Sequence, residues 1–187
     1  MSEQNKPVSY TNRKGKTYYL HAAKRKSGKT VYVMKLSSRD ALTQLPEGYE
    51  IMEGVNGQVS VGRPKPRQIT VEEETLILEK LQRLGLKYYR CEAKDAYLTV
   101  YAPVYSETAF DDLSSVFPNS FIDSTKAFIF EKMQTGPLEP VMRFELIDEE
   151  NRRFNIERMT YRGAGDWHSL WKFGALNELA DKFLPHL

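Results

Sequence analysis

The sequence has few cysteines and no long apolar runs, the features that form disulfides or metal sites and cross membranes. Cys91 is the only cysteine among 187 residues, which excludes an internal disulfide and a cysteine-rich zinc site. No run approaches the roughly 20 apolar residues of a membrane span, and the polar, basic N-terminal segment lacks the apolar core of a signal peptide. A lone cysteine fits a reducing compartment, so we expect a cytoplasmic protein without membrane contact.

Motifs for chemistry are equally scarce. The three histidines lie far apart, so no two have the spacing of a metal site. The glycine-rich phosphate-binding patterns and the nucleophile signatures of hydrolases are absent from the sequence. We therefore predict no catalytic residue, no metal and no cofactor, and an enzyme is the less favoured interpretation.

What the chain does contain is charge that is segregated along its length. Residues 1–69 hold 13 Lys and Arg against 5 Asp and Glu, whereas residues 70–187 hold 14 against 20. Such a split is typical of a basic module joined to a neutral or acidic body. Between them, the prolines of RPKPR stiffen the chain and extend it. We predict three parts: a basic β module over 8–62, a proline-rich linker over 63–68 and a body over 69–187.

The predicted fold class is α+β. In the basic module, turn signals at 13–16 and 26–29 separate three strands, and Asn56-Gly57 marks another hairpin. If Ser27-Gly28 is a two-residue loop, Ala22 faces Val33 across the second hairpin. Residues 38–45 could form one helical turn.

The stretch from Ile69 to Pro103 organises the body as one helix followed by one hairpin. Thr70 and Glu73 have the spacing of a capping box, and Gly85 is the expected left-handed end of the helix. Two runs rich in Tyr, Leu and Val follow, with a turn between them at 93–96.

The remaining elements are predicted from periodicity. We expect a helix over 106–118, a strand at KAFIFEKM, a hairpin across 148–151 and a C-terminal amphipathic helix that ends at Pro185. In the hairpin, alternation puts Met142, Phe144 and Leu146 on one face and Arg143 on the other. The aromatic residues Trp167, Trp171 and Phe173 are interpreted as core or as an oligomer contact.

The phrases NRKGKTYYLH, SGK, PEGYEI, NGQV, MRFELIDEENRRF and RGAGDW occur in this order. On these phrases the chain resembles a family of uncharacterised prokaryotic proteins over most of its length, and least over 106–134. The resemblance implies that the basic module and the body occur together and that the source is microbial and intracellular. It assigns no activity, cofactor or functional residue.

The best functional hypothesis is that the basic hairpins contact nucleic acid. Lys and Arg release counterions from phosphates, and tyrosines can stack on unpaired bases. The less specific explanation is a small solvated sheet whose lysines protect its edges from aggregation. The candidate residues are Arg13, Lys14, Lys16, Tyr18, Lys24, Arg25, Lys26, Lys29 and Tyr32.

Two other functions stay open. The basic module could dock on acidic protein surfaces such as 72–74 or 148–150, in the same chain or in another one. Alternatively, Glu92-x-Lys94 at a strand end matches part of a metal-dependent nuclease site, but it lacks the upstream acidic partner that holds the ion. A match of two residues is expected by chance, so the nuclease hypothesis ranks third.

Overall fold

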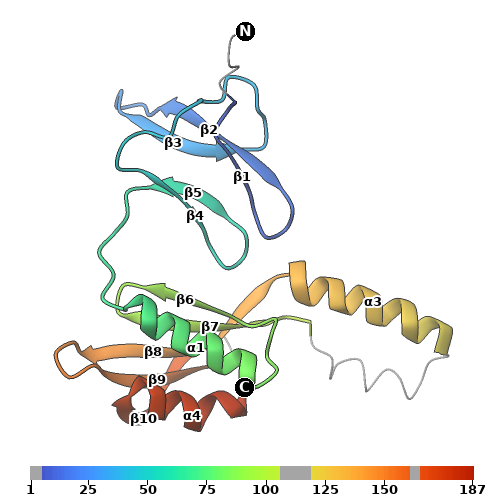
Figure 1. Cartoon of the computed structure of the whole chain (residues 1–187), viewed down its shortest axis with the longest axis vertical. Helices are drawn as coiled ribbons and strands as arrows, with labels where there is room; N and C mark the ends of the chain where they lie inside the picture. The colour runs from blue at the N-terminus through green and yellow to red at the C-terminus, as the bar shows by residue number, and fades with distance from the viewer. Residues whose placement is uncertain (1–5, 106–118, 161–164) are drawn as a thin grey trace. The chain divides into compact units, whose positions relative to one another are not determined.

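The computed structural model describes residues 6–105, 119–160 and 165–187. Within these residues the chain forms three α-helices and ten strands in antiparallel sheets, which confirms the predicted α+β class. It divides into two compact units, 1–65 and 66–187, here called the basic unit and the acidic unit (Figure 1). No described helix is both long and apolar enough to cross a membrane.

The basic unit contains a three-stranded sheet of order β1-β2-β3 and a two-stranded sheet, β4-β5. Both sheets are built of consecutive hairpins, so the predicted meander and the hairpin at Asn56-Gly57 are confirmed. The strands are β1 (Ser9–Thr11), β2 (Thr17–Lys24), β3 (Thr30–Lys35), β4 (Glu50–Glu53) and β5 (Val59–Gly62).

All three hairpin turns of the basic unit share one geometry. In the β2–β3 turn the Arg25 N–H donates to the Lys29 carbonyl at 2.9 Å, and the Gly28 N–H donates to the Arg25 carbonyl at 2.9 Å. Gly28 has a φ of 78°, a conformation that strains most residues other than glycine. Three-residue loops of this kind end in a left-handed residue that matches the strand twist. The other two turns run over 12–16 and 54–58.

This turn geometry corrects the register expected for the second hairpin. Tyr32, and not Val33, lies opposite Ala22. The expectation was wrong by one residue because the left-handed glycine adds a third residue to the loop. Residues 38–45 also differ from expectation, since they form turns and no helix. There the Leu42 N–H donates to the Leu20 carbonyl at 2.8 Å, a bond to β2 in place of a local helical one.

In the acidic unit, helix α1 (Val71–Arg83) begins and ends as predicted. The Thr70 N–H donates to Glu73 Oε2 at 2.9 Å, and the Glu73 N–H donates to Thr70 Oγ1 at 3.3 Å, so the capping box is complete. At the other end the Leu86 N–H donates to the Leu81 carbonyl at 2.9 Å, and Gly85 has a φ of 76°. This is a Schellman ending.

One five-stranded antiparallel sheet of order β10-β9-β8-β7-β6 carries the acidic unit. Helices α1 and α4 cover one of its faces (Figure 1). The predicted hairpins β6–β7 and β8–β9 are confirmed. The elements are β6 (Arg90–Lys94), β7 (Tyr97–Pro103), α3 (Asn119–Thr135), β8 (Leu138–Asp148), β9 (Arg153–Thr160), β10 (Asp166–Ala175) and α4 (Leu176–Phe183), followed by a short 3-10 turn (Leu184–His186).

The hydrophobic core lies between the covered face and the two helices. Alternation along the strands directs one set of side chains into it, as predicted for the β8–β9 hairpin. An ion pair between Lys80 of α1 and Asp181 ties the two helices together at the edge of the core. The fully buried core side chains of the sheet are Leu98, Val100, Met142, Phe144, Phe154 and Ile156.

Two elements of the acidic unit differ from the predictions. KAFIFEKM is part of α3 and not a strand, because the inward residues Ile129 and Met133 lie four positions apart, the spacing of a helix. Strand β10 was not predicted, and it leaves Trp171 78% and Phe173 47% exposed, so the core interpretation was wrong for both. The helix predicted over 106–118 lies outside the described residues.

Both edges of the large sheet are obstructed. At β6 the Ala93 N–H donates to Glu74 Oε1 at 3.3 Å, so a helix side chain occupies part of the edge. At β10 the register shifts between Ser169 and Phe173, and Trp171 within this bulge has a φ of 54°. Bulges and covered edges prevent another strand from adding to a sheet.

Glu73 joins α1 to the far end of the β8–β9 hairpin. Besides closing the capping box, its Oε1 accepts from Arg152 Nε at 2.9 Å and its Oε2 accepts from Arg152 Nη2. Arg152 itself has a φ of 48° and also donates to the Gln68 carbonyl at 3.1 Å. The side chain of Glu73 is only 15% exposed, so the pair is shielded better than a surface ion pair.

We expect Glu73→Ala to lower the free energy of unfolding of the acidic unit by about 2 kcal/mol, because it removes a cap and a bidentate charged contact together. Urea unfolding followed by tryptophan fluorescence reports this unit, since it holds both tryptophans. Glu79→Ala, at an exposed position of the same helix, is the control and should cost less than about 0.5 kcal/mol. Equal losses in the two variants would contradict the bridging role.

Candidate binding surfaces

The second face of the five-stranded sheet carries polar and aromatic side chains. Because successive residues of a strand point to opposite faces, the neighbours of the core residues all lie here. All five strands contribute to the face, so residues far apart in sequence meet on it. Its members include Glu92, Lys94, Tyr97, Thr99, Tyr101, Arg143, Glu145, Asn155, Glu157, Trp167 and Ser169.

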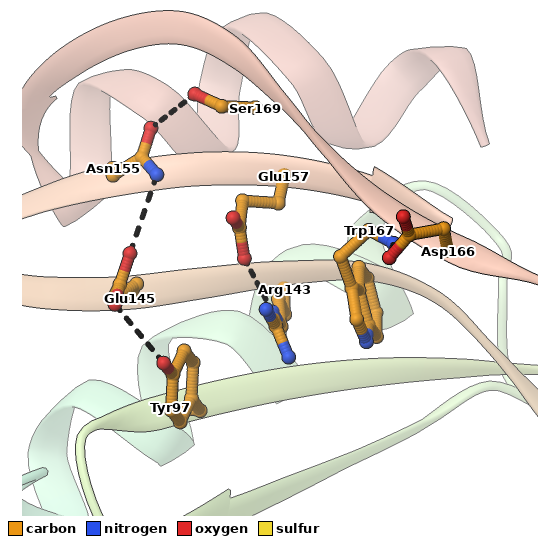
Figure 2. A network of polar contacts seen from close by, with 8 residues as sticks. All are labelled: Tyr97, Arg143, Glu145, Asn155, Glu157, Asp166, Trp167 and Ser169. Atoms are coloured by element: carbon orange, nitrogen blue, oxygen red, sulfur yellow. Dashed lines mark hydrogen bonds and ion pairs between the residues drawn. The ribbon is translucent and has the colours of Figure 1, made fainter. Parts of the chain in front are cut away.

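A chain of hydrogen bonds crosses this face from β10 to β7 (Figure 2). The hydroxyl of Ser169 donates to Asn155 Oδ1 at 3.0 Å, and Asn155 Nδ2 donates to Glu145 Oε2 at 3.4 Å. The Tyr97 hydroxyl donates to Glu145 Oε1 at 3.0 Å, and the Trp171 N–H donates to Ser169 Oγ at 3.1 Å. Asn155 is buried, and its amide is satisfied at both ends, so the network fixes the Tyr97 ring and the β10 bulge together.

Arg143 lies between two aromatic rings on the same face. Its guanidinium carbon is 4.5 Å from the centre of the Tyr97 ring and 4.4 Å from the Trp167 ring, within the range of cation–π contacts. Its Nε forms an ion pair with Glu157 on the neighbouring strand (Figure 2). Arg143 and Glu157 therefore form a cross-strand ion pair, and the charge of Arg143 is compensated.

Beside this stack the surface forms a hollow of about 370 Å³, here called the β7 hollow. The Tyr101 hydroxyl donates to Glu92 Oε2 at 3.3 Å within it. Burial, and then the negative charge of Glu92, raises the pKa of Tyr101 to about 12. The hydrogen bond to Glu145 likewise raises the pKa of Tyr97. The lining residues are Glu92, Lys94, Asp95, Tyr97, Thr99, Tyr101, Pro140, Arg143 and Trp167.

The structure places the nuclease-like pair Glu92 and Lys94 at the rim of the β7 hollow. Across residues 6–105, 119–160 and 165–187, no group of three or more His, Cys, Asp or Glu side chains could hold a metal ion. Cys91, on the adjacent position of β6, is partly buried, and burial raises the pKa of its thiol far above the usual range. A raised pKa keeps a thiol protonated, and the protonated form is the less nucleophilic one.

Sequence reasoning missed most of this hollow. It recognised Glu92 and Lys94 only as a fragment of another motif, and it interpreted Trp167 as core or as an oligomer contact. The alternation in β7 and β8 would have put Tyr97, Tyr101 and Arg143 on one face. Trp167 could not be assigned to the same face, because β10 was not predicted and its pairing with β9 includes a bulge.

The predicted nucleic-acid-binding residues fall into separate groups. Lys24, Arg25, Lys26 and Lys29 are all exposed at the β2–β3 turn, here called the Lys24–Lys29 turn. Among the described residues, none of these four cations has a carboxylate within ion-pair distance. They form a concentrated and uncompensated positive charge.

The other candidates lie elsewhere. Arg13, Lys14 and Lys16 belong to the β1–β2 turn, at the opposite end of the eight-residue strand β2, roughly 25 Å away at the rise of an extended strand. That turn packs on the β4–β5 hairpin, where the Arg13 N–H donates to Glu53 Oε1 at 2.8 Å. Tyr18 lies at the same end of β2 and is half-buried. Tyr32 is also half-buried, and its ring centre lies 5.0 Å from that of Tyr49 in an edge-to-face contact. The nine residues therefore do not form one patch.

Comparison of the chain with protein-family models, with curated proteins and with solved structures finds no match. The resemblance to a prokaryotic family therefore stays a prediction.

Replacing Tyr101 by Phe should change how stability depends on alkaline pH. The folded chain keeps the Tyr101 proton up to a pKa of about 12, against an ordinary value of 10.0. The resulting stabilisation is complete below about pH 10 and is lost as the pH rises toward 12, where the folded chain also releases the proton. In urea unfolding, the free energy of unfolding of Tyr101→Phe should therefore fall less between about pH 10 and pH 12 than that of the parent chain. Identical pH profiles would contradict the assignment.

Proposed function

We propose that the chain binds nucleic acid through the Lys24–Lys29 turn of its basic unit. One observation carries the proposal: four exposed cations share a single hairpin turn and have no carboxylate partner among the described residues. Cations held apart from carboxylates can neutralise phosphates and release their counterions. A two-stranded β-ribbon also has dimensions that fit a major groove.

The charge of the whole unit supports the same partner. Residues 1–65 hold 12 Lys and Arg against 5 Asp and Glu, a net charge of +7, and residues 66–187 hold 15 against 20, a net charge of −5. A positive unit of this kind raises the local concentration of a polyanion and speeds association. We also propose a cytoplasmic location. A single cysteine, Cys91, forms no internal disulfide, so the fold does not depend on an oxidising compartment.

Binding through the turn should depend on phosphates more than on bases. Tyr18 lies at the other end of β2, and Tyr32 is half-buried against Tyr49, so neither is presented beside the four cations as an open stacking platform. Contacts to phosphates position a protein but carry no sequence information. We therefore propose binding with little sequence preference and no catalysis.

The alternative, docking of the basic unit on acidic protein surfaces, receives less support. In the first of the two surfaces considered, Glu73 is engaged by Arg152, and Glu74 forms an ion pair with Arg67 at 3.0 Å. In the second, Asp148 accepts from the Asn151 N–H at 3.0 Å, and that bond lowers the pKa of Asp148. These carboxylates already have partners in the chain, which weakens their attraction for a second basic surface.

The test replaces the four cations of the turn with Gln and measures binding to a fluorescein-labelled oligonucleotide between roughly 50 and 200 mM salt. With four phosphate contacts, the slope of log K against log salt should shrink by about 3 in this variant, and affinity at low salt should fall at least about tenfold. The variant is Lys24→Gln, Arg25→Gln, Lys26→Gln and Lys29→Gln.

A matched control removes the same charge from the acidic unit. It changes three exposed lysines and one exposed arginine there, Lys87→Gln, Arg158→Gln, Lys172→Gln and Lys182→Gln, and should leave the salt slope nearly unchanged. If both variants lose affinity equally, only net charge matters and the turn is not the site. If the parent chain shows no salt-sensitive binding, the proposal fails.

A further inference from the structure

The β7 hollow has a net negative charge near its walls. Arg143, the only arginine among the described residues that line it, is already compensated by Glu157. The other charged residues of the lining are Glu92, which is negative and half-buried, and Asp95 and Lys94, which have opposite charges and are both exposed. Glu145 adds a further carboxylate behind Tyr97. A ligand that enters the hollow therefore meets an excess of carboxylate charge.

The walls of the hollow are aromatic. Tyr97, Tyr101 and Trp167 contribute ring surface, and Pro140 adds an apolar side. Two of these rings already hold a guanidinium, that of Arg143, at 4.5 and 4.4 Å. Tyr101 has no such partner among the described residues, and its ring lies beside the Glu92 carboxylate, to which its hydroxyl donates. An aromatic face next to a carboxylate is the combination that attracts an organic cation.

We propose that the β7 hollow binds an organic cation, an alkylammonium or alkylguanidinium group, with Glu92 as its counter-ion and the Tyr101 ring as its aromatic contact. A hollow of about 370 Å³ is within the range of small-ligand sites. The proposal is independent of nucleic-acid binding, since it concerns the other unit and the opposite charge.

An anion fits this hollow less well. The guanidinium plane of Arg143 has a ring near it on two sides, and its Nε is held by Glu157. The hydrogen bond to Glu145 raises the pKa of Tyr97, and burial and then the charge of Glu92 raise the pKa of Tyr101, so each phenol lies beside a carboxylate. An anion would also face Glu92 and Asp95 across the opening.

The test follows the fluorescence of Trp167 in a Trp171→Phe background, where Trp167 is the only tryptophan left. The probes are butylguanidinium and butylammonium, with neutral butylurea as the isosteric comparison. We expect saturable binding of the two cations with a dissociation constant in the millimolar range, as for a small ligand on an open site, and no saturable response to butylurea.

Variants of the hollow then assign the contacts. Glu92→Gln keeps the shape but removes the counter-ion, and should weaken binding of the cations about fivefold. Tyr101→Leu removes the ring and should weaken binding by a similar factor. Glu79→Gln makes the same charge change outside the hollow and should have no effect. Circular dichroism of each variant establishes that it is folded.

Two sources of the cationic group can be separated with short peptides. If acetyl-Gly-Lys-Gly-amide binds at least tenfold more tightly than butylammonium, while its Gln analogue does not bind, the natural ligand is a basic side chain of a protein. If the peptide binds no better than butylammonium, the ligand is a free small amine or guanidine. The proposal is overturned if butylurea binds as well as the cations do, if no probe saturates, or if Glu92→Gln binds like Glu79→Gln.

Discussion

Burial of one face of the five-stranded sheet is the constraint on which the acidic unit depends. Leu98, Val100, Phe144 and Ile156 are fully buried against α1 and α4, and a slip of one residue in any strand would expose its share of them. The register that keeps them inside also decides which side chains share the other face. The stack around Arg143 and the β7 hollow are consequences of that register, because their residues come from all five strands of the sheet and only the pairing of the strands brings them together.

The two units solve their stability problem differently. The acidic unit has a contiguous core and fixes its helix with the contacts of Glu73. Among its described residues the basic unit has few buried side chains, Leu20 among the hydrophobic ones and Asn12 and His21 among the polar ones. It depends instead on three hairpins with the same turn, on the Asn12 amide that donates to the Gly57 carbonyl at 2.7 Å, and on hydrogen bonds to backbone such as that between His21 and Ser37 at 2.8 Å. A scaffold made of hairpins leaves its turns free to carry charge, and the Lys24–Lys29 turn is the one with four exposed cations.

Local signals in the sequence predicted local structure well. The capping box at Thr70, the Schellman ending at Gly85 and the alternation of the β8–β9 hairpin each depend on a few neighbouring residues, and each is present. The predictions that were wrong concern features that depend on distant residues or on patterns that fit two structures. A run such as Phe128-Ile129-Phe130 suits a strand or a helix until its packing is known, and the glycine of a three-residue loop cannot be told from that of a two-residue loop by its identity alone. The hollow could not be assembled, since Trp167 joins it only through the irregular pairing of β10 with β9.

The central claim, that one face of the sheet is buried and the other is open to ligands, can be measured directly by nuclear magnetic resonance with a soluble paramagnetic agent. Thr99 and Val100 are adjacent in β7 and point to opposite faces. We expect strong relaxation of the Thr99 methyl group and of the Trp167 indole N–H, and none at the methyl groups of Val100 and Ile156. Equal protection of Thr99 and Val100 would show that both faces are covered and would contradict this account.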